Sequence, residues 1–165
     1  MRRLPPDPAD LTPSSARTLV LRWLGQRELT ISQIRLRLRR RDYPDDTIAT
    51  ALARLVSDGH VDDGRAARAR ARHEIAIKRH GRGRVLRQVE ALGVDRDTAQ
   101  QAVAAAFEGI DEDRLLADAL ARRLRGRPLP TDRPSLGKLY GWLLRQGFDA
   151  GKVSALFRRG GRDLE

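Results

Sequence analysis

The 165-residue chain contains no cysteine, which excludes disulfide frameworks, thiolate zinc sites, iron–sulfur clusters and thiol nucleophiles. Histidine is scarce as well: His60, His73 and His80 are the three in the chain, and none stands in a metal-binding spacing with a carboxylate. We therefore expect no catalytic metal and no other cofactor, and we interpret these histidines as structural or surface residues. No Ser/His/Asp arrangement stands out, so the sequence does not predict an enzyme.

Long apolar runs are also missing. No stretch approaches the roughly 18 apolar residues that a membrane-spanning helix needs. The N-terminal sequence MRRLPPDPADLTP carries Pro and Asp where a secretion signal would have its apolar segment. Residues 1–13 are thus expected to form a short disordered lead, and the protein is expected to be cytoplasmic.

Aromatic residues make up only 4% of the chain, so Leu, Ile, Val and Ala must form most of the core, and a hydrophobic content of 40% still favours a folded chain. The charge is strongly basic, with 33 Lys and Arg against 22 Asp and Glu, or +11 in all. Lysine occurs only at positions 78, 138 and 152, so the other 30 basic residues are arginine. Guanidinium groups bind phosphates and carboxylates in bidentate fashion, which indicates an anionic partner. Codon bias in a GC-rich genome would also favour Arg over Lys, and the sequence leaves that alternative open.

Helix-forming residues dominate from end to end, with Ala, Leu, Arg and Gln between short breaks and no alternating strand pattern. Helix start signals recur. Thr12-Pro13 suits a helix N-terminus, and Thr30 to Gln33 forms the capping-box pattern T-x-x-Q. Asp62-Asp63 and Asp111 to Asp113 place carboxylates at the positive ends of further helices. The sequence therefore predicts an all-α fold.

One pattern of apolar positions occurs three times: it begins at Ile34, recurs 51 residues later at Val85, and recurs 54 residues after that at Leu139. The aligned positions are Ile34, Leu38, Tyr43, Ile48 and Leu52; Val85, Val89, Val94, Ala99 and Val103; and Leu139, Leu143, Phe148, Val153 and Phe157. The turn inside the pattern repeats too, as Asp42-Tyr43-Pro44, Gly93-Val94-Asp95 and Gly147-Phe148-Asp149. A further helix leads each pair, so we expect an elongated array of three tandem three-helix repeats.

The start signals and the repeated turns also give the expected boundaries. Repeat one covers residues 14–61, repeat two residues 62–110 and repeat three residues 111–158. Repeat three contains a Pro-rich loop at 126–134, and a fraying tail follows at 159–165.

Three segments resemble the RecX family of bacterial regulators of the RecA recombinase. Residues 32–43 are similar to the family's S-x-x-E-L pattern ending in K-G-F, and residues 59–63 (GHVDD) to its G-[LI]-[LIV]-D-D junction. Residues 139–148 (LYGWLLRQGF) are similar to its L-x-x-[FY]-L-x-R-[RK]-G-F block. The chain departs from the family at Ala66 and Arg70, where aromatics are usual, and at Gly81-Arg82, where Gly-Pro is common.

The resemblance implies a function. It implies that the chain binds the RecA–DNA nucleoprotein filament and modulates its recombinase activity, with inhibition as the expected effect. The processes concerned are DNA repair, recombination and the SOS response. It further implies that the chain lies in the filament groove across adjacent protomers. From the capped helical pattern of every repeat we also expect a monomer. The basic charge adds an expectation of weak DNA binding that depends little on sequence and steeply on salt.

Candidate binding residues come from the basic segments. At about 100° per residue, Arg65, Arg68, Arg72 and Arg79 fall on one stripe of the helix expected from residue 62 to about 79, with Ala66, Ala69, His73 and Ile77 on an apolar seam. The other candidates are Arg82 and Arg84, just after that helix, and Arg37 and Arg40 in repeat one. The alternative is that these arginines simply solvate exposed helix faces.

Two other functions remain open at this point. Paired helices joined by a tight turn also describe a helix-turn-helix DNA-binding regulator, although no helix carries the Asn/Gln/Arg cluster that specific base readout needs. A basic protein associated with ribosomes or RNA would be expected to carry Lys-rich tails, which this sequence lacks.

Overall fold

The computed structural model describes residues 11–162, with side chains through Arg159; residues 1–10 of the expected lead and 163–165 of the expected tail lie outside the described part. Within it the chain forms nine helices and no strand. They are α1 (Pro13–Leu24), α2 (Ile31–Arg39), α3 (Asp45–Ser57), α4 (Asp63–Ala76), α5 (Arg82–Glu90), α6 (Arg96–Phe107), α7 (Glu112–Leu124), α8 (Arg133–Arg145) and α9 (Ala150–Arg162). The last helix continues four residues beyond the expected end of repeat three.

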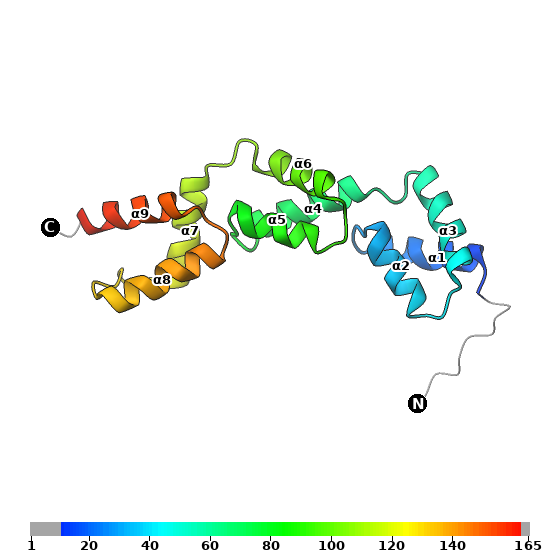
Figure 1. Cartoon of the computed structure of the whole chain (residues 1–165), viewed down its shortest axis with the longest axis horizontal. Coiled ribbons are helices and arrows are strands. Elements are labelled where there is room, and N and C mark those ends of the chain that lie inside the picture. Colours follow the sequence, from blue (N-terminus) through cyan, green and yellow to red (C-terminus); the bar gives the residue numbers. More distant parts are fainter. Residues whose placement is uncertain (1–10, 163–165) are drawn as a thin grey trace, which may run out of the picture.

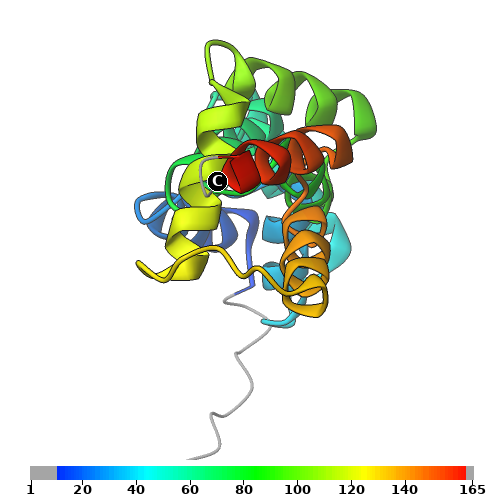
Figure 2. The same ribbon diagram turned by 90° about the vertical axis from the view of Figure 1, so that its left-hand side faces the viewer.

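The helices form an elongated array of three groups, which confirms the predicted architecture. Figure 1 shows α1–α3 at one end, α4–α6 in the middle and α7–α9 at the other end. In each group the first and second helices pack on the third, as α1 and α2 do on α3 and as α4 and α5 do on α6. Figure 2 looks along the array from the α7–α9 end, with the other groups behind.

The predicted helix starts are confirmed by their capping contacts. Thr12 and Thr30 each form a capping box, in which the hydroxyl accepts from the backbone three residues on and that residue's side chain accepts from the cap. Asp62 and Asp111 each accept backbone N–H groups of the first helical turn. These contacts are local in sequence, which is why they could be predicted without tertiary information.

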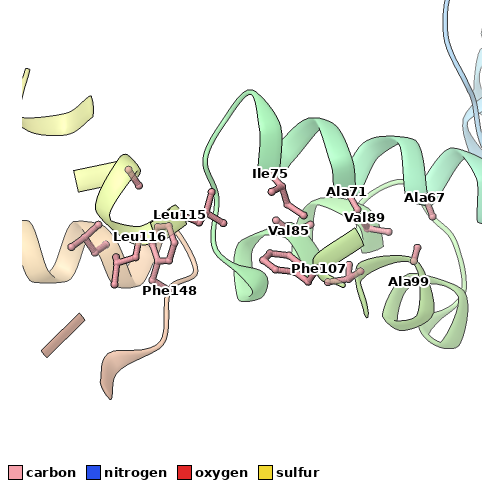
Figure 3. Packing of buried hydrophobic residues seen from close by; sticks show 14 of the residues in the cluster. Ala67, Ala71, Ile75, Val85, Val89, Ala99, Phe107, Leu115, Leu116 and Phe148 are labelled. Atoms are coloured by element: carbon pink, nitrogen blue, oxygen red, sulfur yellow. The ribbon is translucent and has the colours of Figure 1, made fainter. Parts of the chain in front are cut away.

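The repeated apolar positions form the core. All of them are buried except Tyr43, Val94 and Phe157, and these three pack half-buried against it. Repeat one has a cluster of its own, whereas the clusters of repeats two and three merge into a single one. Figure 3 shows this merged cluster, with Leu116 of α7 beside Phe148. Repeats two and three are therefore joined by apolar packing.

The repeated turn has one backbone conformation. Asp42, Gly93 and Gly147 stand at equivalent positions, and all three have positive φ, at 64°, 78° and 90°. Glycine adopts this left-handed region at no steric cost, and Asp is among the few other residues that tolerate it. The turn lets the chain reverse between the second and third helices of each repeat.

The same turn also joins neighbouring repeats. The Thr30 hydroxyl donates to the Leu92 carbonyl (2.7 Å), and the Ser32 hydroxyl donates to the Gly93 carbonyl (2.8 Å). At the next junction the Gly81 N–H donates to the Gln146 carbonyl (2.9 Å), and the Gly83 N–H donates to the Gly147 carbonyl (3.1 Å). From the first junction to the second, each donor residue moves by 51 positions and each acceptor residue by 54. These are the same offsets that separate the three repeats in the sequence. The second helices of repeats one and two thus each begin on the turn of the following repeat.

The predicted seam of α4 is wrong. Ala66 is buried as expected, but Ala69 is only half-buried, and His73 and Ile77 are exposed. The buried face instead carries Ala66, Ala67, Ala71, Glu74 and Ile75. Ala and Arg alternate along this helix, so two adjacent faces have nearly equal hydrophobicity, and packing against α5 and α6 selects between them. The helix also ends at Ala76, so Arg79 does not lie on its stripe.

Candidate interaction surface

Arg65, the first residue of the predicted stripe, is engaged within the chain. Its guanidinium donates to the Glu28 carboxylate (2.7 Å) and to the carbonyls of His60 (2.8 Å) and Gly59 (3.2 Å). The bond to Glu28 raises the pKa of Arg65 above its ordinary value. Arg65 therefore ties the start of repeat two to the loops of repeat one.

Arg82 and Arg84 connect repeat two to repeat three. Arg82 pairs with Glu112 (2.8 Å) while its guanidinium lies 4.5 Å from the centre of the Phe107 ring. Arg84 donates to the side-chain oxygen of Gln146 (2.9 Å). Both side chains are thus held by intrachain partners at the second junction.

The two candidates in repeat one differ from each other. Arg37 is half-buried and lies with Arg41 on the ring of Trp23, each guanidinium 5.6 Å from the ring centre. Burial, and secondarily the charge of Arg27, lowers the pKa of Arg37. Arg40 is exposed at the end of α2.

Arg68 and Arg72 remain as the exposed members of the α4 stripe. Arg68 lies close enough to Asp62 to help lower the pKa of that carboxyl, although the Arg65 backbone N–H is the larger cause. Arg72 makes no ion pair or side-chain hydrogen bond within the described residues. The two are four residues apart, so they stand one helical turn from each other.

Arg70 occupies one of the positions where the family usually has an aromatic. Its guanidinium pairs with the buried Glu74 (2.9 Å) and donates to Gln88 of α5 (3.0 Å). Glu74 also contacts the ring Nδ1 of His80 at 2.6 Å. Burial lowers the pKa of His80, opposed by its hydrogen bond to Glu74. A polar cluster of Arg70, Glu74 and His80 thus joins α4 to the segment before α5.

Arg79 enters a basic pocket that the sequence did not predict. This Trp142 pocket lies between the C-terminal ends of α4, α7 and α8, and its volume is about 230 Å³. It is lined by Trp142 and five cations: Lys78, Arg79, Arg122, Arg123 and Arg125. The sequence signal for it is the arginine-rich end of α7, with Arg122, Arg123 and Arg125.

A metal site and a membrane-spanning helix are both absent from the described residues. No group of three or more His, Asp or Glu side chains there is placed to hold a metal ion. None of the described helices is long and apolar enough to cross a membrane.

Comparison with known proteins agrees with the repeat architecture. Residues 16–55 match the family model described as "RecX, first three-helix domain". The fold is similar to the crystal structure of RecX from Lactobacillus salivarius, with a TM-score of 0.72 at 21% identity, covering 95% of this chain and 99% of that one. A second RecX crystal structure gives a TM-score of 0.71 at 23% identity and covers 88% of this chain and 71% of that one.

Curated relatives extend the match along the sequence. The regulatory protein RecX of Mycobacterium avium is 32% identical over 148 residues, which cover 87% of this chain and 84% of the relative. The regulatory protein RecX of Thermobifida fusca is 33% identical over 157 residues, which cover 92% of this chain and 80% of the relative. The chain therefore belongs to the RecX family of regulatory proteins.

Proposed function

We propose that the protein binds the RecA–DNA filament in the cytoplasm as a monomer and inhibits its recombinase activity. The observation that carries this proposal is the extended array of repeats, which presents arginines along its length rather than around one catalytic pocket. Such an array suits a long partner surface that alternates acidic protein and DNA phosphate, because many moderate contacts then add up.

Within this proposal, Arg68 and Arg72 are the first contact residues to test. Both are exposed on α4 in the central repeat, and neither is needed for a junction between repeats. Arg65, Arg82 and Arg84 are expected to act mainly by holding the repeats in line, because their guanidinium groups already have partners within the chain.

A helix-turn-helix regulator of specific DNA sites is the alternative. The exposed side of α3 carries Ala49, Thr50 and Ala53 with a single arginine, Arg54. Specific readout needs bidentate donors such as Arg, Asn or Gln placed together on a helix that enters the major groove. This face of α3 lacks such a set, so the alternative would depend on the exposed Arg96, Gln100 and Gln101 of α6.

Co-sedimentation separates the two functions. The protein is mixed with RecA–single-stranded DNA filaments, with RecA alone and with DNA alone, and the pelleted fraction is measured at several salt concentrations. Strong pelleting with filaments, against weak and salt-sensitive binding to DNA alone, supports the proposal. Pelleting that requires one duplex sequence, with a preference of about 10³-fold that survives a rise in salt, would favour the alternative.

A further inference from the structure

The charged side chains that line the Trp142 pocket are all basic. Five cations line it, and no carboxylate does. Some basic side chains elsewhere pair with an acid, as Arg65 does with Glu28 and Lys152 with Asp113. Within the described residues, Lys78, Arg79 and Arg125 form no ion pair. Like charges held close together repel one another, so this arrangement favours a bound anion.

The helix dipole accounts for only part of the arrangement. The pocket lies where three helices end, since α4 ends at Ala76, α7 at Leu124 and α8 at Arg145. Each helix C-terminus contributes about half a negative charge, so the three together offset roughly one and a half of the five positive charges. More than three remain uncompensated, which exceeds what capping three helix ends requires.

Several of the cationic groups are fixed in place. Arg122 donates to the Ile77 carbonyl (2.7 Å), which ties the end of α7 to the end of α4. Arg79 and Arg125 follow these two helix ends, and both have positive φ, at 57° and 51°. Non-glycine residues adopt this region rarely and at a cost in free energy. The backbone that carries Arg79 and Arg125 is therefore held in a defined conformation where α4 and α7 end.

An aromatic platform adjoins the cations. The Arg123 guanidinium lies 5.4 Å from the centre of the Trp142 ring. These two residues also line a second pocket of about 290 Å³, which adds Arg127 and Lys138 and again has no acidic lining residue. A ligand running from one pocket to the other must pass the indole and its stacked guanidinium.

The ligand that fits both features is a single strand of nucleic acid. It offers phosphates at regular intervals to the cations and unpaired bases to the indole, and proteins that bind single strands combine a positively charged groove with aromatic stacking. An acidic polypeptide would satisfy the cations, but its carboxylate side chains offer nothing to stack on Trp142. A duplex keeps its bases paired and stacked within, away from the indole.

We propose, building on the DNA affinity that forms part of the proposed function, that the Trp142 pocket binds single-stranded nucleic acid. Its phosphates contact Lys78, Arg79 and Arg125, and one base stacks against Trp142. The site lies at the junction of repeats two and three, away from Arg68 and Arg72 on the exposed face of α4. Nucleic-acid contact and filament contact are thereby assigned to different parts of the array.

The test uses the full chain and a fluorescein-labelled oligothymidylate of about 12 nucleotides, within the usual range of single-strand site sizes. The variant Lys78→Gln/Arg125→Gln removes two pocket charges whose side chains have no partner in the described chain. The matched control, Arg54→Gln/Arg96→Gln, removes two exposed charges from α3 and α6. Fluorescence anisotropy is expected to show affinity reduced about tenfold for the pocket variant and little changed for the control.

The salt dependence gives a second readout. Loss of two phosphate contacts should reduce the slope of log K against log salt by about 1.4 for a single strand. Equal affinities and equal slopes for the two variants would overturn the pocket assignment while leaving the proposed function standing. Absence of oligonucleotide binding by the unaltered protein would overturn both the pocket and the DNA-binding part of the proposed function.

The fluorescence of Trp142 tests whether a base stacks against its indole ring. The chain has two tryptophans, so Trp23→Phe leaves Trp142 as the single tryptophan. Saturating oligothymidylate is expected to quench its emission, and inorganic polyphosphate is expected to bind with much less quenching. If polyglutamate binds as tightly as the oligonucleotide at equal salt and quenches equally, the pocket takes acidic polypeptides and the assignment to nucleic acid is wrong.

Discussion

Gly147 and Arg84 belong to different repeats, yet their backbones are in contact: a β-carbon added at Gly147 would overlap the backbone nitrogen of Arg84. The approach is mutual, since a β-carbon at Gly81 would lie 2.5 Å from the Gly147 carbonyl oxygen. Hydrogen bonds from Gly81 and Gly83 to the turn of repeat three depend on this approach. The junction of repeats two and three is thus built on the absence of side chains at these positions.

Gly147→Ala should therefore destabilise the protein strongly. The substitution adds a left-handed strain of about 1–2 kcal/mol to a steric overlap with backbone that cannot easily move, for a total of roughly 3 kcal/mol. Gly109→Ala is the matched control, because Gly109 also has positive φ (73°) but has no atom within 4 Å of the added carbon. Urea denaturation should show the larger loss at Gly147, and equal losses would mean that the junction relaxes freely.

Charge reversal on α4 tests the filament contact. Arg68→Glu/Arg72→Glu should abolish co-sedimentation with RecA–DNA filaments, because each change replaces an attraction to an acidic surface with a repulsion. Helical content should stay unchanged by circular dichroism, since exposed substitutions usually shift stability by about 0.5 kcal/mol or less.

Arg158→Glu/Arg159→Glu is the control for that experiment. It changes the net charge equally, and both residues are exposed near the end of α9. Equal loss of filament binding in the two variants would mean that total charge, rather than the α4 face, determines affinity.

Arg65→Ala should affect stability more than Arg72→Ala does. Arg65 loses an ion pair to Glu28 and hydrogen bonds to two carbonyls, but its side chain is 40% exposed, so solvent weakens these contacts. The expected loss is about 1 kcal/mol for Arg65→Ala and near zero for Arg72→Ala, by thermal or urea denaturation. Similar values for both would show that the Arg65 contacts contribute nothing to stability.

Acid should weaken the polar cluster around Glu74. Burial lowers the pKa of His80 below its ordinary 6.5, so near and below pH 6.5 the unfolded state binds more protons than the folded state. The contribution of His80 is therefore fully present above about pH 6.5 and is lost as the pH falls below it, by at most about 1.4 kcal/mol per pH unit.

The measurement is the free energy of unfolding between pH 8 and 5 for the unaltered protein and for His80→Gln. The variant should be less sensitive to pH in this range. The helix-capping carboxyls of Asp62, Asp95 and Asp111 have lowered pKa values and titrate in a more acid range, so they do not obscure the comparison. An identical pH profile for the two proteins would contradict the assignment to His80.

Much of the fold could be predicted from the sequence, because its determinants are local. The capping boxes at Thr12 and Thr30 and the left-handed turn at Gly93 act within a few residues of chain. The spacing of the apolar positions gave the buried faces of α2 and α5 correctly. It failed on α4, where alanines on adjacent faces differ too little in hydrophobicity for the pattern to choose between them.

The candidate site depended on tertiary structure to a greater degree. Nothing in the helical periodicity distinguishes Arg65, held by Glu28 from repeat one, from Arg72, which faces solvent. The partners of Arg82 and Arg84 also come from far along the chain. A helical wheel shows on which face of its own helix an arginine lies. The neighbour that its guanidinium contacts depends on how the repeats pack against one another.

The sequence by itself thus determined the helices, their caps, the three-fold repeat and the family, because these depend on short-range spacing and on residue type. Only the tertiary structure decided which arginines are engaged within the chain and which are exposed. It also created the Trp142 pocket, since Lys78 and Arg125 lie 47 residues apart and meet only where α4, α7 and α8 converge. The close approach of Gly147 to Arg84 joins the same two repeats, and this long-range contact too exists only in the folded chain.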